Sequence, residues 1–161
     1  MEKLEKAVAN LLAEDARFTA EKIAMILGEE ESTIRALIAR MEEEGKIVKY
    51  TAILNSEDED LVEAFIEVKV TPKKGTGFDT VAEEISACSE VKSLYLMSGA
   101  YDFAVIVEGK SLRSISRFVS ERISTYDCVL STATHFILKK YKIEGVVTHK
   151  KAEERRLSVQ P

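Results

Sequence analysis

The chain has 161 residues, of which 45% are hydrophobic and 32% charged, and its formal net charge is −5. This composition is typical of a soluble globular protein with one ordinary domain or two small ones, and no apolar run reaches the ~18 residues that span a bilayer. The charged N-terminus is unlike a signal peptide, so we expect a cytoplasmic protein with no membrane partner. The acidic balance argues against nucleic acid binding over the whole surface but leaves room for a local basic patch.

The first 54 residues contain three amphipathic segments followed by β-branched residues. Residues 3–14 carry apolar side chains at helical spacing, Thr19 is suited to cap a second helix that Gly28 ends, and a third helix is predicted over residues 31–44. The composition of residues 46–54 predicts a short strand, or wing. Residues 1–54 therefore resemble a winged helix-turn-helix unit, although three small helices also pack together in proteins that never contact DNA.

The hydrophobic period changes from helix to strand after an acidic linker at residues 55–61. Alternating apolar residues predict strands over 62–71, 91–97, 102–108 and 128–141, with a loop at 72–75 and a further short strand within 143–147. Helices are predicted over 77–87 and, with Ser111 as its cap, over 111–125. The order βαββαβ predicts an α+β fold with a ferredoxin-like domain at residues 62–148. The tail, 149–161, is polar, and both a solvated end and a nucleic-acid tail fit it.

Two helices can cover only one face of such a sheet. The strands carry more apolar residues than these helices are expected to bury, so we expect the other face to pack against a second copy of the chain. The residues counted toward this surplus are Val91, Tyr95, Met97, Phe103, Val105, Val107, Phe136 and Leu138.

The turn between the two middle strands holds Ser98, Gly99 and Asp102. Backbone amides at a turn that contains glycine are able to bind a carboxylate, and the carboxylate of Asp102 could hold an ammonium group. This combination suits a small zwitterion. The alternative is a hairpin turn in which Asp102 only caps backbone groups.

Four stretches of the chain resemble the Lrp/AsnC family, the leucine-responsive or feast/famine transcriptional regulators. They are LLAEDARF at 11–18, the segment from Ser32 to Ile47, SGAYDF at 98–103 and VLSTAT at 129–134. The resemblance implies a dimer built through the sheets, often assembled into tetramers or octamers, that binds operator DNA with paired N-terminal units. It also implies an amino-acid effector at subunit interfaces, near Ser98, Gly99, Ala100, Tyr101, Asp102, Thr132 and Thr134. Ala100 replaces a polar residue that the family usually has.

The third predicted helix corresponds to the family's recognition helix. The residues expected at DNA are Ser32, Thr33, Arg35, Ala36, Arg40, Lys46 and Lys49, with Arg35 at a guanine edge and the last three cations at phosphates. The chain departs from the family at residues 29–31, where three glutamates replace Leu-Ser-Pro. Residues 1–53 hold eight Lys or Arg against eleven Asp or Glu. The alternative is that these basic residues are solvated surface charges. Weak DNA binding by one unit would have to be recovered by several units acting together.

Three functions are compatible with these observations. The first is an amino-acid-responsive transcriptional regulator, in which the effector changes how DNA-binding units are spaced. The second is an amino-acid sensor that has lost operator binding. The third is an enzyme similar to the siroheme decarboxylases, which resemble this family in fold but need several His and Arg in one cavity. With only His135 and His149, and without a metal or nucleophile motif, we expect no catalytic residues and no cofactor.

Overall fold

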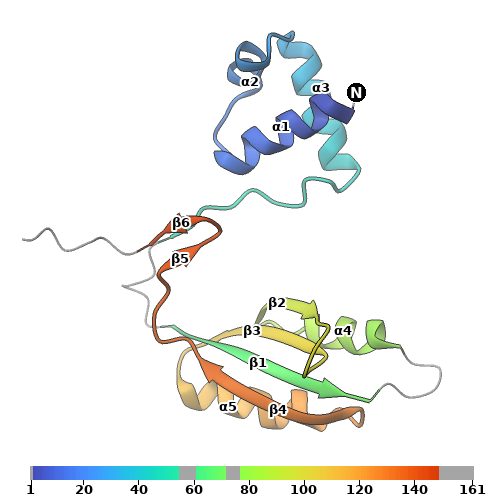
Figure 1. The fold of residues 1–161 in the computed structure, drawn as a ribbon, viewed down its shortest axis with the longest axis vertical. Coiled ribbons are helices and arrows are strands. Elements are labelled where there is room, and N and C mark those ends of the chain that lie inside the picture. Colours follow the sequence, from blue (N-terminus) through green and yellow to red (C-terminus); the bar gives the residue numbers. More distant parts are fainter. Residues whose placement is uncertain (1, 55–60, 72–76, 149–161) are drawn as a thin grey trace, which may run out of the picture. The chain divides into compact units, whose positions relative to one another are not determined.

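The computed structural model describes residues 2–54, 61–71 and 77–148, and the chain forms two compact units, Met1–Leu54 and Asn55–Pro161 (Figure 1). The expected linker segment at 55–60, the loop at 72–75 and the tail at 149–161 lie outside the described residues. In the part of the chain that the structure describes, no helix is long and apolar enough to cross a membrane.

The N-terminal unit contains the three predicted helices, α1 (Glu2–Glu14), α2 (Ala20–Leu27) and α3 (Glu31–Glu43). The Thr19 side chain accepts a hydrogen bond from the Lys22 amide, which confirms the predicted cap, and Gly28 ends α2 at φ +71°. The helices enclose one small core, formed by Val8, Leu12, Ile23, Ala24, Ile34, Leu37 and Met41. The local sequence signals and the packing of apolar faces therefore agree in this unit.

No strand forms at residues 46–54, where the sequence predicts a wing. A strand needs hydrogen bonds to a neighbouring strand, and no described residue pairs with the backbone of residues 48–54. The Tyr50 hydroxyl instead donates a hydrogen bond to Glu42 Oε1 of α3 at 2.9 Å. The β-branched composition is real, but composition alone does not supply a partner strand.

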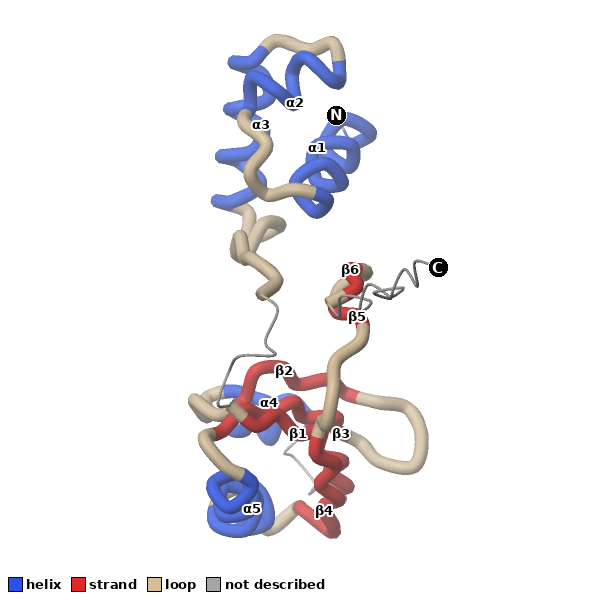
Figure 2. The backbone as a smooth tube through the Cα atoms, turned by 90° about the vertical axis from the view of Figure 1, so that its left-hand side faces the viewer, coloured by secondary structure: helices blue, strands red, loops and turns tan. Residues whose placement is uncertain are grey.

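The C-terminal unit is the predicted ferredoxin-like domain (Figures 1 and 2). Its elements are β1 (Val62–Val70), α4 (Phe78–Ser86), β2 (Val91–Leu96), β3 (Phe103–Gly109), α5 (Leu112–Glu121) and β4 (Val129–Phe136). The strands form one antiparallel sheet in the order β2-β3-β1-β4, so the α+β fold class is confirmed. A separate two-stranded hairpin, β5 (Lys142–Ile143) with β6 (Val146–Val147), follows the sheet in the chain.

Two predicted elements end earlier than expected. The helix predicted over 111–125 ends at Glu121 and is followed by a short 3-10 helix, η2 (Ile123–Thr125), because Ile123 turns inward to a core in which it is 1% exposed. The Ser111 cap is confirmed. The strand predicted over 128–141 ends at Phe136. Its partner strand β1 begins at Val62, so the last hydrogen bond along this edge is from the Ile137 amide to the Glu63 carbonyl.

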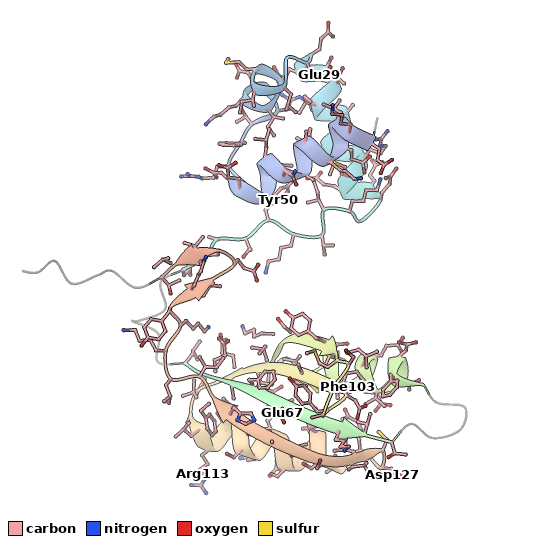
Figure 3. The ribbon with its side chains drawn as sticks, in the orientation of Figure 1. Glu29, Tyr50, Glu67, Phe103, Arg113 and Asp127 are labelled. Atoms are coloured by element: carbon pink, nitrogen blue, oxygen red, sulfur yellow. The ribbon has the colours of Figure 1, made fainter. Side chains whose placement is uncertain are left out.

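The core lies between the two helices and one face of the sheet. Alternate β1 residues, Ala64, Ile66, Val68 and Val70, point to this face and are buried, together with Val81 and Ile85 of α4 and Ile115, Phe118 and Val119 of α5. Phe103 is the largest fully buried side chain, whereas Arg113 points away from the sheet on the outer side of α5 (Figure 3). The opposite face of the sheet, which we call the open face, carries no helix.

The composition of the open face differs from the prediction. Phe103, Val105 and Val107 lie under the helices, and Val91 and Phe136 pack at the margin of the same core. Tyr95 does lie on the open face, opposite Ala104, while Met97 and Leu138 lie outside the strands. The register instead places Phe65, Glu67, Ile106, Ala133 and His135 on the open face. Side chains alternate along a strand, so the face on which a hydrophobic set lies depends on one residue of register.

Candidate functional site

The turn between β2 and β3 presents exposed backbone. The Met97 amide donates to the Asp102 carbonyl at 2.7 Å and closes the hairpin, and Ser98, Gly99 and Ala100 are all exposed. Gly99 has φ +154°, a conformation that residues with a side chain rarely adopt. The turn therefore holds its amides in a shape that depends on glycine.

Asp102 anchors this turn to the neighbouring strand. Its amide donates to the Val68 carbonyl at 3.0 Å, and its Oδ2 accepts a hydrogen bond from the Val70 amide at 2.8 Å. The β1–β4 register shifts between Lys69 and Val70, so the carboxylate satisfies a backbone donor at an irregular point of the sheet. Of the two interpretations of Asp102, backbone capping is present in the structure. A carboxylate has acceptor sites on both oxygens, so this role leaves room for a ligand.

Thr132 and Thr134 lie on β4, on the far side of β1 from the turn. They pair with Val68 and Ile66 and share the helix-covered side of the sheet. Thr132 is level with Asp102 along β1, but two strand spacings, about 10 Å, separate the strands that carry them. A single chain therefore does not gather the seven expected effector residues into one pocket.

Tyr101 is the turn residue whose ring reaches the open face. It is half-buried and meets Phe65 of β1 edge-on, with ring centroids 5.9 Å apart and an interplanar angle of 74°. Sequence reasoning did not select Phe65 as a site residue. Its alternation with the buried Ala64 and Ile66 places it on the open face with Glu67, but its contact with the turn depends on the β1–β3 pairing, which no local pattern contains.

The expected DNA-binding residues of α3 are exposed near its start. Ser32, Thr33, Arg35 and Ala36 are exposed after the turn that contains Glu29, which is labelled in Figure 3. Arg35 forms an ion pair with Glu31 one helical turn earlier. The cation best placed to read a base is therefore already paired with a carboxylate.

Arg40 and Lys46 join the end of α3 to α1. Lys46 lies 2.6 Å from Glu5 and 2.7 Å from Glu44, and Arg40 lies 3.2 Å from Glu5. The hydrogen bond from Lys46 lowers the pKa of Glu5, and the hydrogen bonds to Glu44 and Glu5 raise the pKa of Lys46. Phosphate contacts by Arg40 or Lys46 would have to compete with these carboxylates, whereas Lys49 is exposed.

Replacing Glu5 with glutamine should lower the melting temperature at neutral pH by a few degrees at most. A lowered pKa in the folded state stabilises the fold above the unfolded pKa, and this contribution is lost as the pH falls through the folded value. The difference from wild type should therefore vanish in acid. Circular dichroism melts at pH 7 and near pH 3 test this, with Glu14→Gln at the other end of α1 as the control. An equal difference at both pH values would contradict the role of the ion pair.

The comparisons with known proteins cover both units. Residues 63–147 match the model of the Lrp/AsnC ligand binding domain. The chain belongs to the Lrp/AsnC family. It is 42% identical over 160 residues to YugG of Bacillus subtilis, named an uncharacterized HTH-type transcriptional regulator, across 98% of this chain and 96% of that protein. An uncharacterized HTH-type regulator of Pyrococcus horikoshii is 32% identical over 138 residues, 85% of each chain.

Solved structures share the Lrp/AsnC fold. AsnC of E. coli aligns with a TM-score of 0.69 at 20% identity, over 89% of this chain and 95% of that one. A transcriptional regulator of Neisseria meningitidis, solved as a complex with L-methionine, aligns with a TM-score of 0.71 at 22% identity, over 89% and 93%. The family resemblance predicted from the sequence is confirmed, and the chain is a transcriptional regulator of the Lrp/AsnC family. Within the described residues, no group of three or more His, Cys, Asp or Glu could hold a metal ion.

Proposed function

We propose that this Lrp/AsnC regulator binds operator DNA through α2 and α3 and binds a free amino acid at the turn of residues 98–102. We further propose that it acts as an oligomer assembled through the open face of its sheet. The observation that carries the effector proposal is the exposed turn itself, with its shape set by Gly99 and its base anchored by Asp102.

A shared site between copies would explain how the expected effector residues act together. Ser98, Gly99 and Ala100 are exposed residues, and backbone amides at such a turn suit the effector's carboxylate. Asp102 lies beside them, but Thr132 and Thr134 lie two strands away in the same chain. Both threonines lie on the helix-covered side of the sheet, so a second copy would bring them to the turn through a contact other than the open face. The regulator solved with L-methionine supports an amino acid as the class of ligand.

The open face supports assembly because it carries exposed apolar and aromatic side chains without a helix over them. Phe65 and Ile106 are half-buried on the two central strands, and Tyr95 is exposed on the edge strand β2. Glu67, Lys69 and His135 add charged and polar groups to the same face. A mixed surface of this kind is typical of an interface between subunits that are folded before they associate.

The second candidate, an amino-acid sensor without operator binding, is favoured by the charges of the N-terminal unit. Arg35, Arg40 and Lys46 all face carboxylates in the structure, and Glu29, Glu30 and Glu31 lie at the start of α3. These charges lower the DNA affinity of each unit, which favours the sensor. The regulator would offset the low affinity by oligomerisation, which raises the effective concentration of further units once one has bound.

Thermal melting with each of the twenty L-amino acids tests the effector proposal. A ligand at one hundred times its Kd stabilises the folded state by about 2.7 kcal/mol, so we expect one amino acid, or a chemically related group, to raise the melting temperature by several degrees. The D-enantiomer of the best ligand is the control. Equal melting temperatures with all twenty would contradict the proposal.

A further inference from the structure

The four strands of the main sheet carry three carboxylates, Glu63 and Glu67 of β1 and Glu108 of β3, and all three lie on the open face. Glu63 and Glu108 are direct neighbours across the β1–β3 pair, where like charges repel. A lysine neutralises each of these two. Glu63 forms an ion pair with Lys140. Glu108 Oε1 lies 2.8 Å from Lys92 Nζ. Lysine keeps its positive charge throughout the neutral pH range, so both pairs are permanent there.

Glu67, labelled in Figure 3, has a partner of a different kind. Its Oε1 lies 3.3 Å from Nε2 of His135 on β4. His135 pairs in register with Phe65, next but one to Glu67 along β1, and the Phe65 ring packs against the imidazole with centroids 5.9 Å apart. A histidine side chain ordinarily gains or loses its charge between about pH 5 and pH 8. Of the three carboxylates, Glu67 is therefore the one whose neutralisation depends on pH.

The surroundings of His135 contain few other charged groups. Glu67 and Glu63 flank it diagonally on β1, and Glu63 is already paired with Lys140. Lys69 lies further along β1, opposite Ser131. On its other side β4 is the edge of the sheet. The remaining titratable side chains on this face come from β2, β3 and the turn between them, and they are Lys92, Tyr95, Tyr101 and Glu108. Among the described residues of the open face, His135 is the only histidine, and no cysteine lies there.

We propose that the His135–Glu67 pair makes assembly through the open face sensitive to pH, with the dimer favoured in mild acid. The inference rests on the proposed assembly. In the single chain the side chains of His135 and Glu67 are 57% and 35% exposed, so a second copy that covers the face removes both from water. A carboxylate removed from water is costly unless a positive charge accompanies it. Protonated His135 supplies that charge, whereas neutral His135 supplies only a hydrogen bond.

Assembly should therefore take up protons. The charged form of His135 is favoured in the dimer, so its contribution to assembly is complete in mild acid and is lost as the pH rises through the neutral range. A two-fold dimer contains the pair twice, once in each copy, which doubles the effect. We expect the dimer dissociation constant to rise about tenfold between about pH 6 and pH 8.

Sedimentation equilibrium of the full chain across this pH range, at constant ionic strength, measures the dissociation constant. Three variants change the pair. His135→Gln removes the titrating group, His135→Lys fixes a positive charge beside Glu67, and Glu67→Gln removes the carboxylate. His149→Gln is the matched control, because it removes the other histidine of the chain, which lies in the tail. Circular dichroism checks that each variant is folded.

Each variant has its own expected pattern. His149→Gln should show the same rise with pH as wild type. His135→Lys should stay tight across the range, as a permanent ion pair does. Glu67→Gln should also lose the rise, with a dissociation constant within about threefold of the wild-type value in mild acid. His135→Gln should stay weak throughout, because Glu67 is then neutralised at no pH.

Three results would overturn the pH dependence: a wild-type dissociation constant that does not change with pH, one that falls as the pH rises, and a rise that persists in His135→Gln. The proposed assembly survives these results if the double variant Ser93→Arg and Tyr95→Arg, which adds two charges to the open face, weakens the dimer. A dimer that this double variant leaves unchanged, or a chain that does not self-associate, removes the proposed assembly and the pH dependence together.

Discussion

Replacing Glu29, Glu30 and Glu31 with glutamine should tighten DNA binding about tenfold at low salt. Glu29 and Glu30 lie in the turn before α3, and Glu31 is the first residue of the helix. This is the end of the helix expected to approach DNA. Three carboxylates there repel phosphates, and Glu31 also pairs with Arg35, so its replacement releases a cation for a base or phosphate. Fluorescence anisotropy with labelled duplex DNA measures the change. The gain should shrink as salt rises, because screening weakens the repulsion that the variant removes.

A charge-matched variant distinguishes local repulsion from net charge. Asp79→Asn, Glu83→Gln and Glu84→Gln neutralise three exposed carboxylates on α4 of the other unit. We expect this control to bind DNA within about threefold of wild type. Equal gains in both variants would show that only overall charge matters. No gain at residues 29–31 would mean that the start of α3 does not approach DNA.

Asp102→Ala should both destabilise the C-terminal unit and weaken amino-acid binding. A turn position alone suggests a mild effect on stability, but the carboxylate accepts the Val70 amide at 2.8 Å. Leaving a half-buried donor unpaired costs about 1–3 kcal/mol, which corresponds to a fall in melting temperature of about 5–10 °C for a domain of this size. The amides of the turn also lose their anchor, so we expect amino-acid affinity to fall at least about tenfold.

Asp102→Asn separates the two roles of this side chain. Its amide oxygen is able to accept the Val70 N–H, so the melting temperature should stay within a few degrees of wild type. The negative charge is lost, so a direct contact with the effector's ammonium predicts weaker binding in a stable protein. Calorimetric titration of the native proteins at one temperature measures this binding. Unchanged affinity in Asp102→Asn would restrict Asp102 to anchoring, and an unchanged melting temperature in Asp102→Ala would contradict the anchoring itself.

Local signals were sufficient for most of the secondary structure. Thr19, Gly28 and Ser111 mark helix ends through interactions with their own neighbours, so their effects can be predicted without knowing the fold. The alternation of β1 likewise predicts a half-buried strand. The βαββαβ order and the turn sequence SGAYDF then led to the family.

The features that the sequence left undetermined depend on contacts between distant segments. The segment at 46–54 has strand composition but no partner among the described residues, and the assignment of Phe103 to the helix-covered face depends on the β1–β3 register. The bond from Val70 to Asp102 and the ring contact of Tyr101 with Phe65 join residues more than thirty positions apart. The ion pairs of Arg40 and Lys46 with Glu5 also emerge only when α1 and α3 are placed together.

The most direct test of the account is a gel-shift titration with the DNA upstream of the protein's own gene. It is run at low and at physiological salt, with and without a mixture of the twenty amino acids. We expect a sequence-specific shift that unrelated DNA does not compete away and whose midpoint moves when the amino acids are added. Absence of a specific shift at both salt concentrations would contradict operator binding and favour the amino-acid sensor.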